Sequence, residues 1–386
     1  MRHAVVIDAV RTPVGRAHAE KGYYRDVRAD DLSADLMTAL IERTGVPASE
    51  IEDIQWGCVN QQGEQGYDVA RQAALIAGLP IEVGGVTVNR NCGSSLQAIN
   101  SAAQSIAAHC EDVQIAGGVE HMHHIPMEAG FNPNPHFFYR HSPATLNMGL
   151  TAENLAHKYK ISRREQDEFA LRSHRQAAAA TDSGLFAREI IPTWGRDDEG
   201  RRLLCIQDQC IRRDTTLEAL ATLKPAFMPD GGTVTAGNSS PLNVGAAAVL
   251  IMSLERAQEL GLKAKAKIRA MAVAGVDPAV MGIGPVPATH KALQRAGLKL
   301  EDIDVIEINE AFAAQTLAVI KLLKLDPERV NVHGGALAIG HPLGASGARI
   351  ATTLIHTMHE RGARFGLATM CIGAGQGIAT IFENSE

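Results

Sequence analysis

The sequence lacks the features that mark several large classes of proteins. Its six cysteines are scattered without a Cys-x-x-Cys pair, so neither a disulfide framework nor a structural zinc site is indicated. No apolar run approaches the ~18 residues of a membrane span, and the first apolar run, 4–7, is too short for a signal peptide. No Gly-x-x-x-x-Gly-Lys phosphate loop occurs, which argues against an NTPase.

A strong excess of charge of one sign is also missing. The net charge of −6 comes from well-mixed acidic and basic residues, without the basic face of a nucleic-acid-binding protein or a polybasic membrane patch. The C-terminal Glu-Asn-Ser-Glu matches no retention or peroxisomal signal. We therefore expect a cytoplasmic protein with no nucleic-acid partner and no integral membrane segment.

The chain does have a globular composition, and strand-like and helix-like runs alternate in the same order in its two halves. In the first half the predicted strands are 4–7, 54–59, 86–89 and 113–116, and the predicted helices are 31–43, 68–77 and 94–109. In the second half the predicted strands are 267–273, 304–308, 330–332 and 365–370, and the predicted helices are 288–296, 311–322 and 345–360.

A segment of different character separates these halves. It contains Asn-Pro-Asn-Pro at 132–135 and a polar helix-like run around 163–180, and it is typical of an inserted loop domain that contacts substrate. We predict three parts: an N-terminal half of residues 1–118 plus 243–262, an inserted loop domain 119–242, and a C-terminal half 263–386. The alternation predicts an α/β fold with mostly parallel sheets and helices on both faces.

Cys92 and His341 occupy matching places in the repeat. Each follows an apolar stretch and precedes a helix-like run, and their separation equals that of Asn60 and Asn309. Since ligands of layered α/β proteins bind near the carboxyl ends of strands, we expect an active site between the halves. Cys92, Asn309, His341 and Cys371 all come just after predicted strands.

Cys92 is the candidate nucleophile. At the start of a helix, the free N–H groups favour a thiolate, so we expect a pKa below the usual ~8.5, and the same groups suit an oxyanion. The alternative is a buried core cysteine, the usual fate of a free thiol. The matching position of His341 favours the catalytic interpretation.

His341 is the candidate base, in a stretch, 333–347, that is too rich in glycine for a regular element. Glycines permit close approach of the backbone to a ligand. A loop histidine that satisfies backbone groups is the alternative; the functional interpretation is a base that takes the thiol proton of Cys92.

Cys371 and Asn309 are weaker candidates when taken alone. Cys371 is compatible with a redox partner, a general acid/base or a small buried residue. Asn309 is compatible with a helix N-cap or with an amide that positions a water or polarises a carbonyl. We expect no metal site, because the run of His121, His123 and His124 lacks further ligands at suitable spacing.

Four motifs taken together resemble the thiolase family, in particular its branch of bacterial 3-ketoacyl-CoA thiolases of fatty-acid β-oxidation. The resemblance runs from Val5 to Phe382. It implies a layered α-β-α-β-α architecture from two repeated halves with an inserted loop domain. The motifs are Asn-Arg-Asn-Cys-Gly-Ser-Ser (89–95), Asn-Glu-Ala-Phe (309–312), Gly-His-Pro-Leu-Gly-Ala-Ser-Gly (340–347) and Cys-Ile-Gly-Ala-Gly-Gln-Gly (371–377).

The resemblance implies an acyltransferase that cleaves 3-ketoacyl-CoA with CoA into acyl-CoA and acetyl-CoA, with CoA as co-substrate and no cofactor. Cys92 would carry the acyl group, and His341 would activate Cys92. Cys371 would exchange protons with acetyl-CoA and CoA. Asn309 would hold a water at one oxyanion site, and the N–H groups of Cys92 and Gly373 would form the other.

The resemblance further implies that Ser240, Met148 and Met281 lie in the pantetheine-contact region. It implies a homodimer or larger assembly, and a complex with a multifunctional hydratase/dehydrogenase α-subunit.

Three positions depart from the usual pattern of the family: Asn91, Asn147 and Val244. They leave acyl-chain length and partner docking open. The alternatives are a condensing synthase, which Cys371 argues against, a biosynthetic-type acetoacetyl-CoA thiolase, and an inactive lipid-binding protein on the same fold, which Cys92 argues against.

Overall fold

A computed structural model of the chain describes residues 2–385, in which twelve strands occur. They are β1 (Ala4–Arg11), β2 (Gly15–Arg16), β3 (Asp53–Gly57), β4 (Val86–Val88), β5 (Val113–His121), β6 (Thr193–Arg196), β7 (Arg202–Cys205), β8 (Asn243–Ser253), β9 (Ala266–Gly275), β10 (Val305–Ile308), β11 (Phe365–Ile372) and β12 (Gln376–Asn384).

The same residues contain ten α-helices and several short 3-10 turns. The helices are α1 (Ala29–Thr44), α2 (Val69–Ile76), α3 (Ser94–Ala107), α4 (Met148–Tyr159), α5 (Arg163–Asp182), α6 (Leu217–Ala221), α7 (Leu254–Glu259), α8 (Pro285–Ala296), α9 (Ala313–Leu323) and α10 (Ser346–Arg361).

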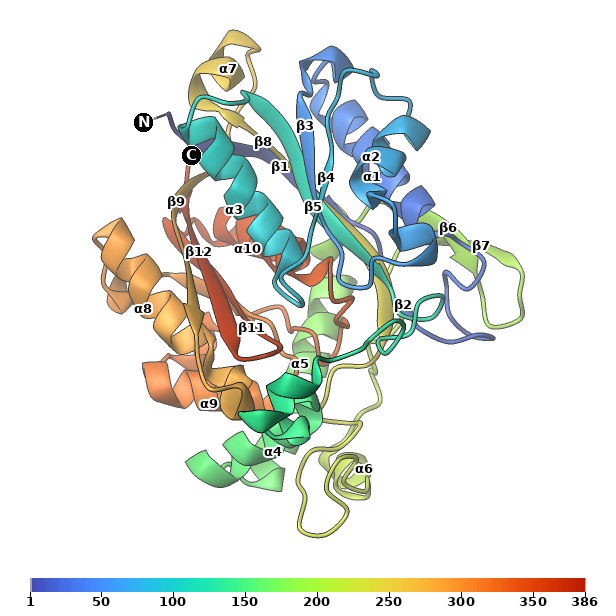
Figure 1. The fold of residues 1–386 in the computed structure, drawn as a ribbon, viewed down its shortest axis with the longest axis vertical. Coiled ribbons are helices and arrows are strands. Elements are labelled where there is room, and N and C mark those ends of the chain that lie inside the picture. The colour runs from blue at the N-terminus through green and yellow to red at the C-terminus, as the bar shows by residue number, and fades with distance from the viewer. Residues whose placement is uncertain (1, 386) are drawn as a thin grey trace.

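The strands of the core follow the order β10-β11-β12-β9-β1-β8-β5-β3-β4 in one 10-stranded sheet, with β2 beside β8. Only two residue pairs join β1 to β9, so the sheet consists of an N-terminal and a C-terminal part that meet at a narrow seam. Figure 1 shows these parts side by side, with blue to teal strands and the yellow β8 in one and orange to red strands in the other.

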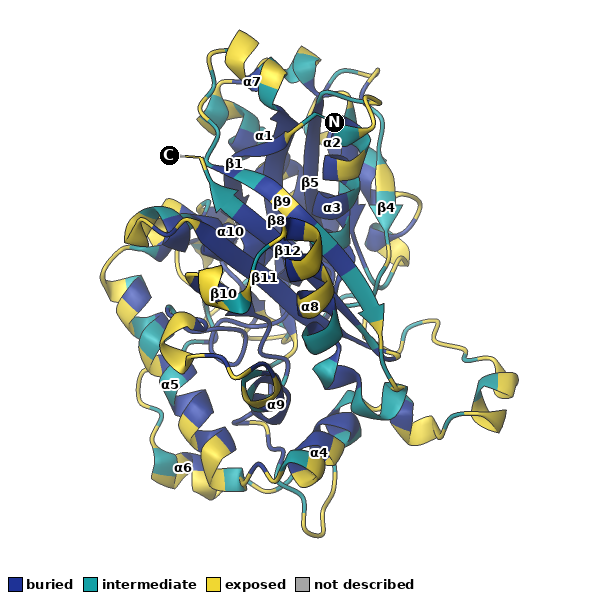
Figure 2. Cartoon of the chain, turned by 90° about the vertical axis from the view of Figure 1, so that its left-hand side faces the viewer, coloured by how far each residue is buried: buried dark blue, intermediate teal, exposed yellow. Residues whose placement is uncertain are grey.

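Helices α3 and α10 form the central layer between the two parts of the sheet. Their apolar faces share one core cluster with residues of β1, β8, β11 and β12. Helices α1 and α2 cover the outer face of the N-terminal strands, and α8 and α9 cover that of the C-terminal strands. The predicted α-β-α-β-α layering is confirmed, and the strands between the layers are mostly buried (Figure 2).

The prediction of mostly parallel sheets is wrong. Only β3–β4, β3–β5 and β10–β11 pair in parallel, whereas the other neighbouring strands of the large sheet pair antiparallel. Alternation of strand and helix makes two strands parallel only where a helical crossover joins them. Strand β8 returns from the inserted segment and β12 returns through a tight hairpin, so both run against their neighbours.

The predicted strand 330–332 is also wrong, because this stretch forms only an isolated bridge between Val330 and Ile306. Asn331 has φ 47, outside the extended region. Most other predicted elements occur with shifted ends; β5, for example, continues from the predicted 113–116 to His121. The domain boundaries stay a prediction.

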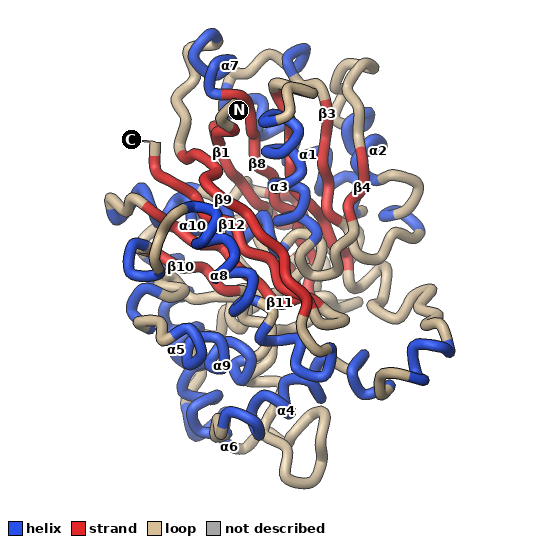
Figure 3. The backbone as a smooth tube through the Cα atoms, turned by 60° about the vertical axis from the view of Figure 1, so that its left-hand side comes forward, coloured by secondary structure: helices blue, strands red, loops and turns tan. Residues whose placement is uncertain are grey.

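The segment between β5 and β8 contributes α4, α5, α6 and the β6–β7 hairpin, which forms a separate two-stranded sheet. Figure 3 shows α4, α5 and α6 below the strands of the large sheet. Arg11 of β1 anchors it, since its fully buried guanidinium pairs with Glu189 at 2.6 Å and with Asp208 at 2.7 Å. No helix within residues 2–385 has the length and apolar character needed to cross a bilayer.

Candidate active site

Cys92 lies in a tight turn between β4 and α3. Asn91 adopts φ 46, and its carbonyl accepts from the Ser94 hydroxyl at 2.6 Å, which closes the turn. Helix α3 begins at Ser94, after the N-cap Gly93. Cys92 is partly buried, and Gly93 packs so closely against Ile372 of β11 that an added Cβ would clash at 2.6 Å. The nucleophile turn therefore rests directly on the C-terminal half.

The expected depression of the thiol pKa is wrong. Burial raises the pKa of Cys92 to about 11, and the backbone N–H groups of Gly373 and of Cys92 itself offset this only in part. Neither N–H group belongs to α3, which begins at Ser94, and the loss of solvation outweighs their effect on the pKa. At neutral pH the thiol keeps its proton and needs a base for attack.

His341 is held with one ring nitrogen available as that base. The Ser346 hydroxyl donates to the Pro342 carbonyl at 2.8 Å, so His341 Nδ1, 2.5 Å from the same hydroxyl oxygen, carries the ring proton. Nε2 is then unprotonated, and Asn309 Nδ2 approaches it at 3.3 Å.

Burial and, to a smaller extent, the nearby guanidinium of Arg349 lower the pKa of His341 to about 3. Arg349 comes from the first turn of α10 and is buried. Within residues 2–385 its one ion-pair partner is Glu307, at 3.9 Å. A neutral imidazole is thereby ensured at all pH values near neutrality.

Two residues that the sequence argument missed fasten the His341 loop. Asn243, the first residue of β8, accepts from the His341 backbone N–H at 2.8 Å. Glu120, near the end of β5, accepts from the Gly344 N–H at 2.9 Å and from the N–H groups of Val59 and Asn60. A polar residue at the end of an apolar strand was the available signal in both cases.

Asn309 and Cys371 meet because β10 and β11 are parallel neighbours, with Ile308 opposite Thr369. Asn309 Oδ1 is buried without a hydrogen-bond partner. An unpartnered buried amide oxygen beside His341 fits a site that holds a water or a substrate oxygen. Burial and the neighbouring Cys92 raise the pKa of Cys371 well above its ordinary value.

Two pairs of the predicted side chains are close neighbours: His341 with Asn309, and Cys371 with Cys92. Two details of the prediction need correction. His341 follows no strand, because 330–332 is loop, and Cys371 lies within β11, opposite Gly377, rather than after it. The proposed catalytic role of each residue stays a prediction.

The expected substrate contacts lie around the same place. Met281 packs in one apolar cluster with Cys371, and Met148, at the start of α4, packs against that cluster. The Met148 sulfur is 3.5 Å from where a Cβ on Gly373 would be. Ser240 donates its backbone N–H to the Ala311 carbonyl at 3.0 Å, beside the 309–312 motif.

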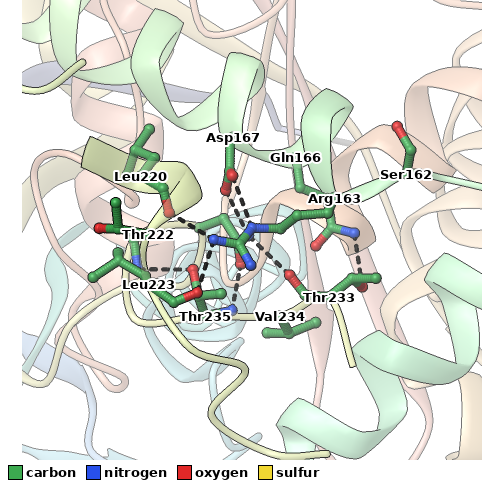
Figure 4. A network of polar contacts seen from close by, with 12 residues as sticks. Ser162, Arg163, Gln166, Asp167, Leu220, Thr222, Leu223, Thr233, Val234 and Thr235 are labelled. Atoms are coloured by element: carbon green, nitrogen blue, oxygen red, sulfur yellow. Dashed lines mark hydrogen bonds and ion pairs between the residues drawn. The ribbon is translucent and has the colours of Figure 1, made fainter. Parts of the chain in front are cut away.

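A polar network fixes the segment that carries Ser240 (Figure 4). Gln166 donates to the Thr233 hydroxyl at 2.9 Å, and Asn238 donates to Asp167 at 3.0 Å. Arg163 donates to the carbonyl of Leu220 in α6 and to that of Leu223 just after this helix. Helix α5 thus holds the inserted segment against the catalytic motifs.

Of the three histidines, His121 and His124 form a cluster with Glu64 in which the ligand atoms lie within 4.8 Å of one another. Each ring nitrogen of the pair already faces a protein group; His124, for example, contacts Glu64 and the Arg25 carbonyl, both at 2.9 Å. The cluster is explained by these hydrogen bonds. That the protein uses no metal stays a prediction.

The structure shows where the three residues that depart from the family pattern lie. Val244 is a buried residue of β8 opposite His121. Asn147 caps α4, since its side chain accepts from the Leu150 N–H at 3.1 Å. Asn91 is in the nucleophile turn.

Comparison with known proteins shows the family of the chain. A model of the thiolase N-terminal domain matches residues 4–255, and a model of the thiolase C-terminal domain matches residues 262–384. The chain belongs to the thiolase family. It is 55% identical to a 3-ketoacyl-CoA thiolase of Idiomarina loihiensis and 57% identical to one of Pectobacterium carotovorum subsp. carotovorum, in each case over 99% of this chain and 100% of the relative.

Solved thiolase structures are similar over the whole length. The human mitochondrial 3-ketoacyl-CoA thiolase has a TM-score of 0.92 and 39% identity, covering 99% of both chains. The acetyl-CoA acetyltransferase of Bacillus anthracis has a TM-score of 0.91 and 42% identity, covering 100% of this chain and 99% of that chain. The predicted resemblance and fold are confirmed.

Proposed function

We propose that this thiolase cleaves 3-ketoacyl-CoA with CoA to give acyl-CoA and acetyl-CoA in fatty-acid β-oxidation. The observation that carries the proposal is the unprotonated Nε2 of His341 in a site that also holds two thiols and the unpartnered oxygen of Asn309. Cleavage of a carbon–carbon bond beside two carbonyls requires a nucleophile, a base, a proton donor for carbon, and two oxyanion sites.

In the first half-reaction, the Cys92 sulfur attacks the 3-keto carbon while its proton passes to His341 Nε2. The N–H groups of Cys92 and Gly373 stabilise the oxyanion. The C2–C3 bond then breaks, and the electron pair enters the acetyl-CoA enolate, whose oxygen lies near Asn309 and His341. Cys371 gives its proton to C2, which releases acetyl-CoA.

In the second half-reaction, the Cys371 thiolate takes the proton of the incoming CoA thiol. The CoA sulfur attacks the thioester carbon on Cys92 at the same oxyanion site. Acyl-CoA leaves when the bond to Cys92 breaks, and the protonated His341 returns its proton to that sulfur. Each role falls to a residue of the chain, so we propose that CoA is a co-substrate and that no metal or organic cofactor takes part.

The test is the covalent intermediate. After mixing with a 3-ketoacyl-CoA and no CoA, mass spectrometry should find the acyl mass on the peptide that contains Cys92. Absence of both adduct and turnover would favour a lipid-binding protein instead. Relative cleavage rates of C4 and C16 substrates separate the β-oxidation assignment from an acetoacetyl-CoA thiolase, which the similarity to the Bacillus anthracis acetyltransferase favours.

We further propose that the chain forms a homodimer through β4, the last strand of the sheet order. Exposed apolar side chains surround this edge: Tyr67, Leu75, Ile76, Ile81 and Val86. An open edge with an apolar surround suits pairing with a second copy. The chain mass is 41.2 kDa, and light scattering of the wild type should give twice this mass. Val86→Lys should reduce the measured mass to that of one chain. The control Ile206→Lys, at an exposed position outside this edge, should leave the measured mass unchanged. A monomeric wild type would refute the dimer.

The resemblance to thiolases of β-oxidation supports two more proposals, a cytoplasmic location and a complex with a multifunctional hydratase/dehydrogenase subunit. A pull-down from the native source tests the complex, and cell fractionation tests the location. The captured material should hydrate enoyl-CoA and oxidise 3-hydroxyacyl-CoA, and the chain should fractionate with cytoplasmic enzymes. A preparation with thiolase activity alone would refute the complex.

A further inference from the structure

The nucleophile turn and the β11–β12 hairpin are joined by side chains of two consecutive residues. Asn91 Nδ2 donates to the Gly373 carbonyl at 3.3 Å, and Arg90 Nη1 donates to the Gln376 side chain at 3.0 Å. Gly373 is the first residue of the hairpin turn, and Gln376 is the first residue of β12. Two turns that are distant in the chain are thus fastened to each other beside Cys92.

Gly373 is both the residue that Asn91 contacts and one of the two residues whose N–H groups lie near the thiol. The backbone N–H groups of Gly373 and of Cys92 lie close enough to the Cys92 sulfur to lower the pKa of its thiol in part. The Gly373 N–H and the Gly373 carbonyl belong to adjacent peptide groups that share the Gly373 Cα. Because a glycine backbone rotates with little hindrance, a bond to the carbonyl limits the rotation through which the N–H could turn away from Cys92. No side chain of Gly373 itself is available for this, and the next residue, Ala374, is exposed with φ 64.

Position 91 is also conformationally demanding. With φ 46 its backbone lies in the left-handed region, where Asn, Asp and Gly are the tolerated residues. The Asn91 N–H is satisfied by Asn89 Oδ1 at 2.9 Å, and its carbonyl by Ser94. The backbone of the turn is therefore closed without the Asn91 amide, which leaves the side chain free to act across the site.

We propose that Asn91 is a positioning residue that aligns the Gly373 N–H with the oxygen of the Cys92-bound acyl group. This deepens the proposed function, on which it rests. The contribution belongs to the oxyanion site at Cys92 and not to the Asn309 site or to the binding of CoA. It predicts a loss in the rate of acyl transfer without a matching change in the affinity for CoA.

Three variants separate the amide from the backbone. Asn91→Gly keeps the positive φ and removes the side chain. Asn91→Asp keeps the shape and the φ tolerance but cannot donate at neutral pH. Asn89→Asp is the matched control: it places the same charge in the same turn and keeps the acceptor for the Asn91 N–H, while losing only a bond to the Val59 carbonyl.

The experiment measures the rate of acyl transfer from a simple acyl-CoA to Cys92 by quenched mass spectrometry, together with kcat, the KM for CoA and the unfolding temperature. In Asn91→Gly and Asn91→Asp, transfer and kcat should fall about threefold to tenfold, the size of one hydrogen bond acting in the transition state. The KM for CoA should stay within about twofold, as expected when only transition-state stabilisation is lost. Asn89→Asp should retain the wild-type rate of transfer.

Wild-type transfer rates in either Asn91 variant, or a raised KM with unchanged kcat, would overturn the role of Asn91. So would an equal loss in Asn89→Asp, since charge alone would then explain the effect. An unfolding temperature of Asn91→Gly well below that of the wild type would assign the residue to folding instead. Failure of the wild type to form any adduct on Cys92 is a separate result and would overturn the proposed function itself.

Discussion

The turn that carries Cys92 and the loop that carries His341 occupy matching places in the two halves but are built differently. The first is short, leads directly from β4 to α3, closes through its own hydrogen bonds and leaves Cys92 partly exposed. The second, residues 331–345, is almost wholly buried and contains no strand. Side chains from other elements, Asn243 and Glu120, hold it.

The difference follows from what each half contributes. A nucleophile that bonds to substrate must be reached from outside, so its turn is local and open. A base that must stay unprotonated needs a dry and fixed position, and burial supplies both. The duplicated fold therefore provides one accessible and one enclosed site residue at equivalent points.

The largest expected effect comes from removing the two thiols separately. Cys92→Ala should lower thiolysis by at least about a thousandfold, as loss of a covalent nucleophile does. Cys371→Ala should still accept an acyl group on Cys92 from a simple acyl-CoA but should fail to cleave 3-ketoacyl-CoA, because no group remains to protonate C2. Thiolysis is followed by loss of substrate absorbance and acyl transfer by mass spectrometry.

Cys110→Ala is the control, since Cys110 is exposed and lies outside the site. It should have wild-type activity in both assays. Normal thiolysis by Cys371→Ala would remove that residue from the mechanism and leave a site with one thiol.

The next prediction tests whether the His341 loop depends on Asn243, a residue distant in the chain. Asn243→Ala removes the acceptor of the His341 N–H. We expect kcat to fall about tenfold to a hundredfold, because a shift of about 1 Å in a catalytic group has effects of this size. Asn100→Ala, which removes another buried amide that accepts from Thr380 at 2.8 Å, should lower the unfolding temperature without a comparable loss of kcat. Equal kcat in both variants would show that the loop keeps its shape without the bond from His341 to Asn243.

The sequence was sufficient where the information is local. Cys92, His341, Asn309 and Cys371 stand in short motifs of glycine and turn residues, and their elements follow from apolar periodicity. The sequence was insufficient where the answer depends on distant segments. The direction of β8 and β12, the tethers Asn243 and Glu120, and the burial that raises the pKa of Cys92 all arise only when the chain is folded.

The pH dependence sharpens the comparison between the open and the enclosed residue. His341 must be neutral to act as a base, and its pKa is lowered to about 3, while the pKa of Cys92 is raised to about 11. The rate of acyl transfer to Cys92 should therefore be flat between about pH 5 and pH 9.

The double variant Arg349→Met with Glu307→Gln removes the buried pair near His341 together, so that no buried charge is left alone. Burial still lowers the pKa of His341, but the contribution of Arg349 is gone. The pKa should rise, and loss of activity on the acid side should begin at a higher pH than in the wild type. An unchanged acid limb would mean that Arg349 does not affect the base.

The smallest expected effect on activity is that of Glu120→Gln, because this side chain binds both the segment after β3 and the His341 loop. The carboxylate accepts from Val59 and Asn60 after β3 and from Gly344 in the His341 loop. Glutamine turns one acceptor into a donor that faces N–H groups, a mismatch of about 1–3 kcal/mol. We expect a lower unfolding temperature and a loss of kcat of only a few fold, since Asn243 still holds His341. A loss of kcat larger than that of Asn243→Ala would show that the carboxylate, and not the amide, is the main restraint on the enclosed loop.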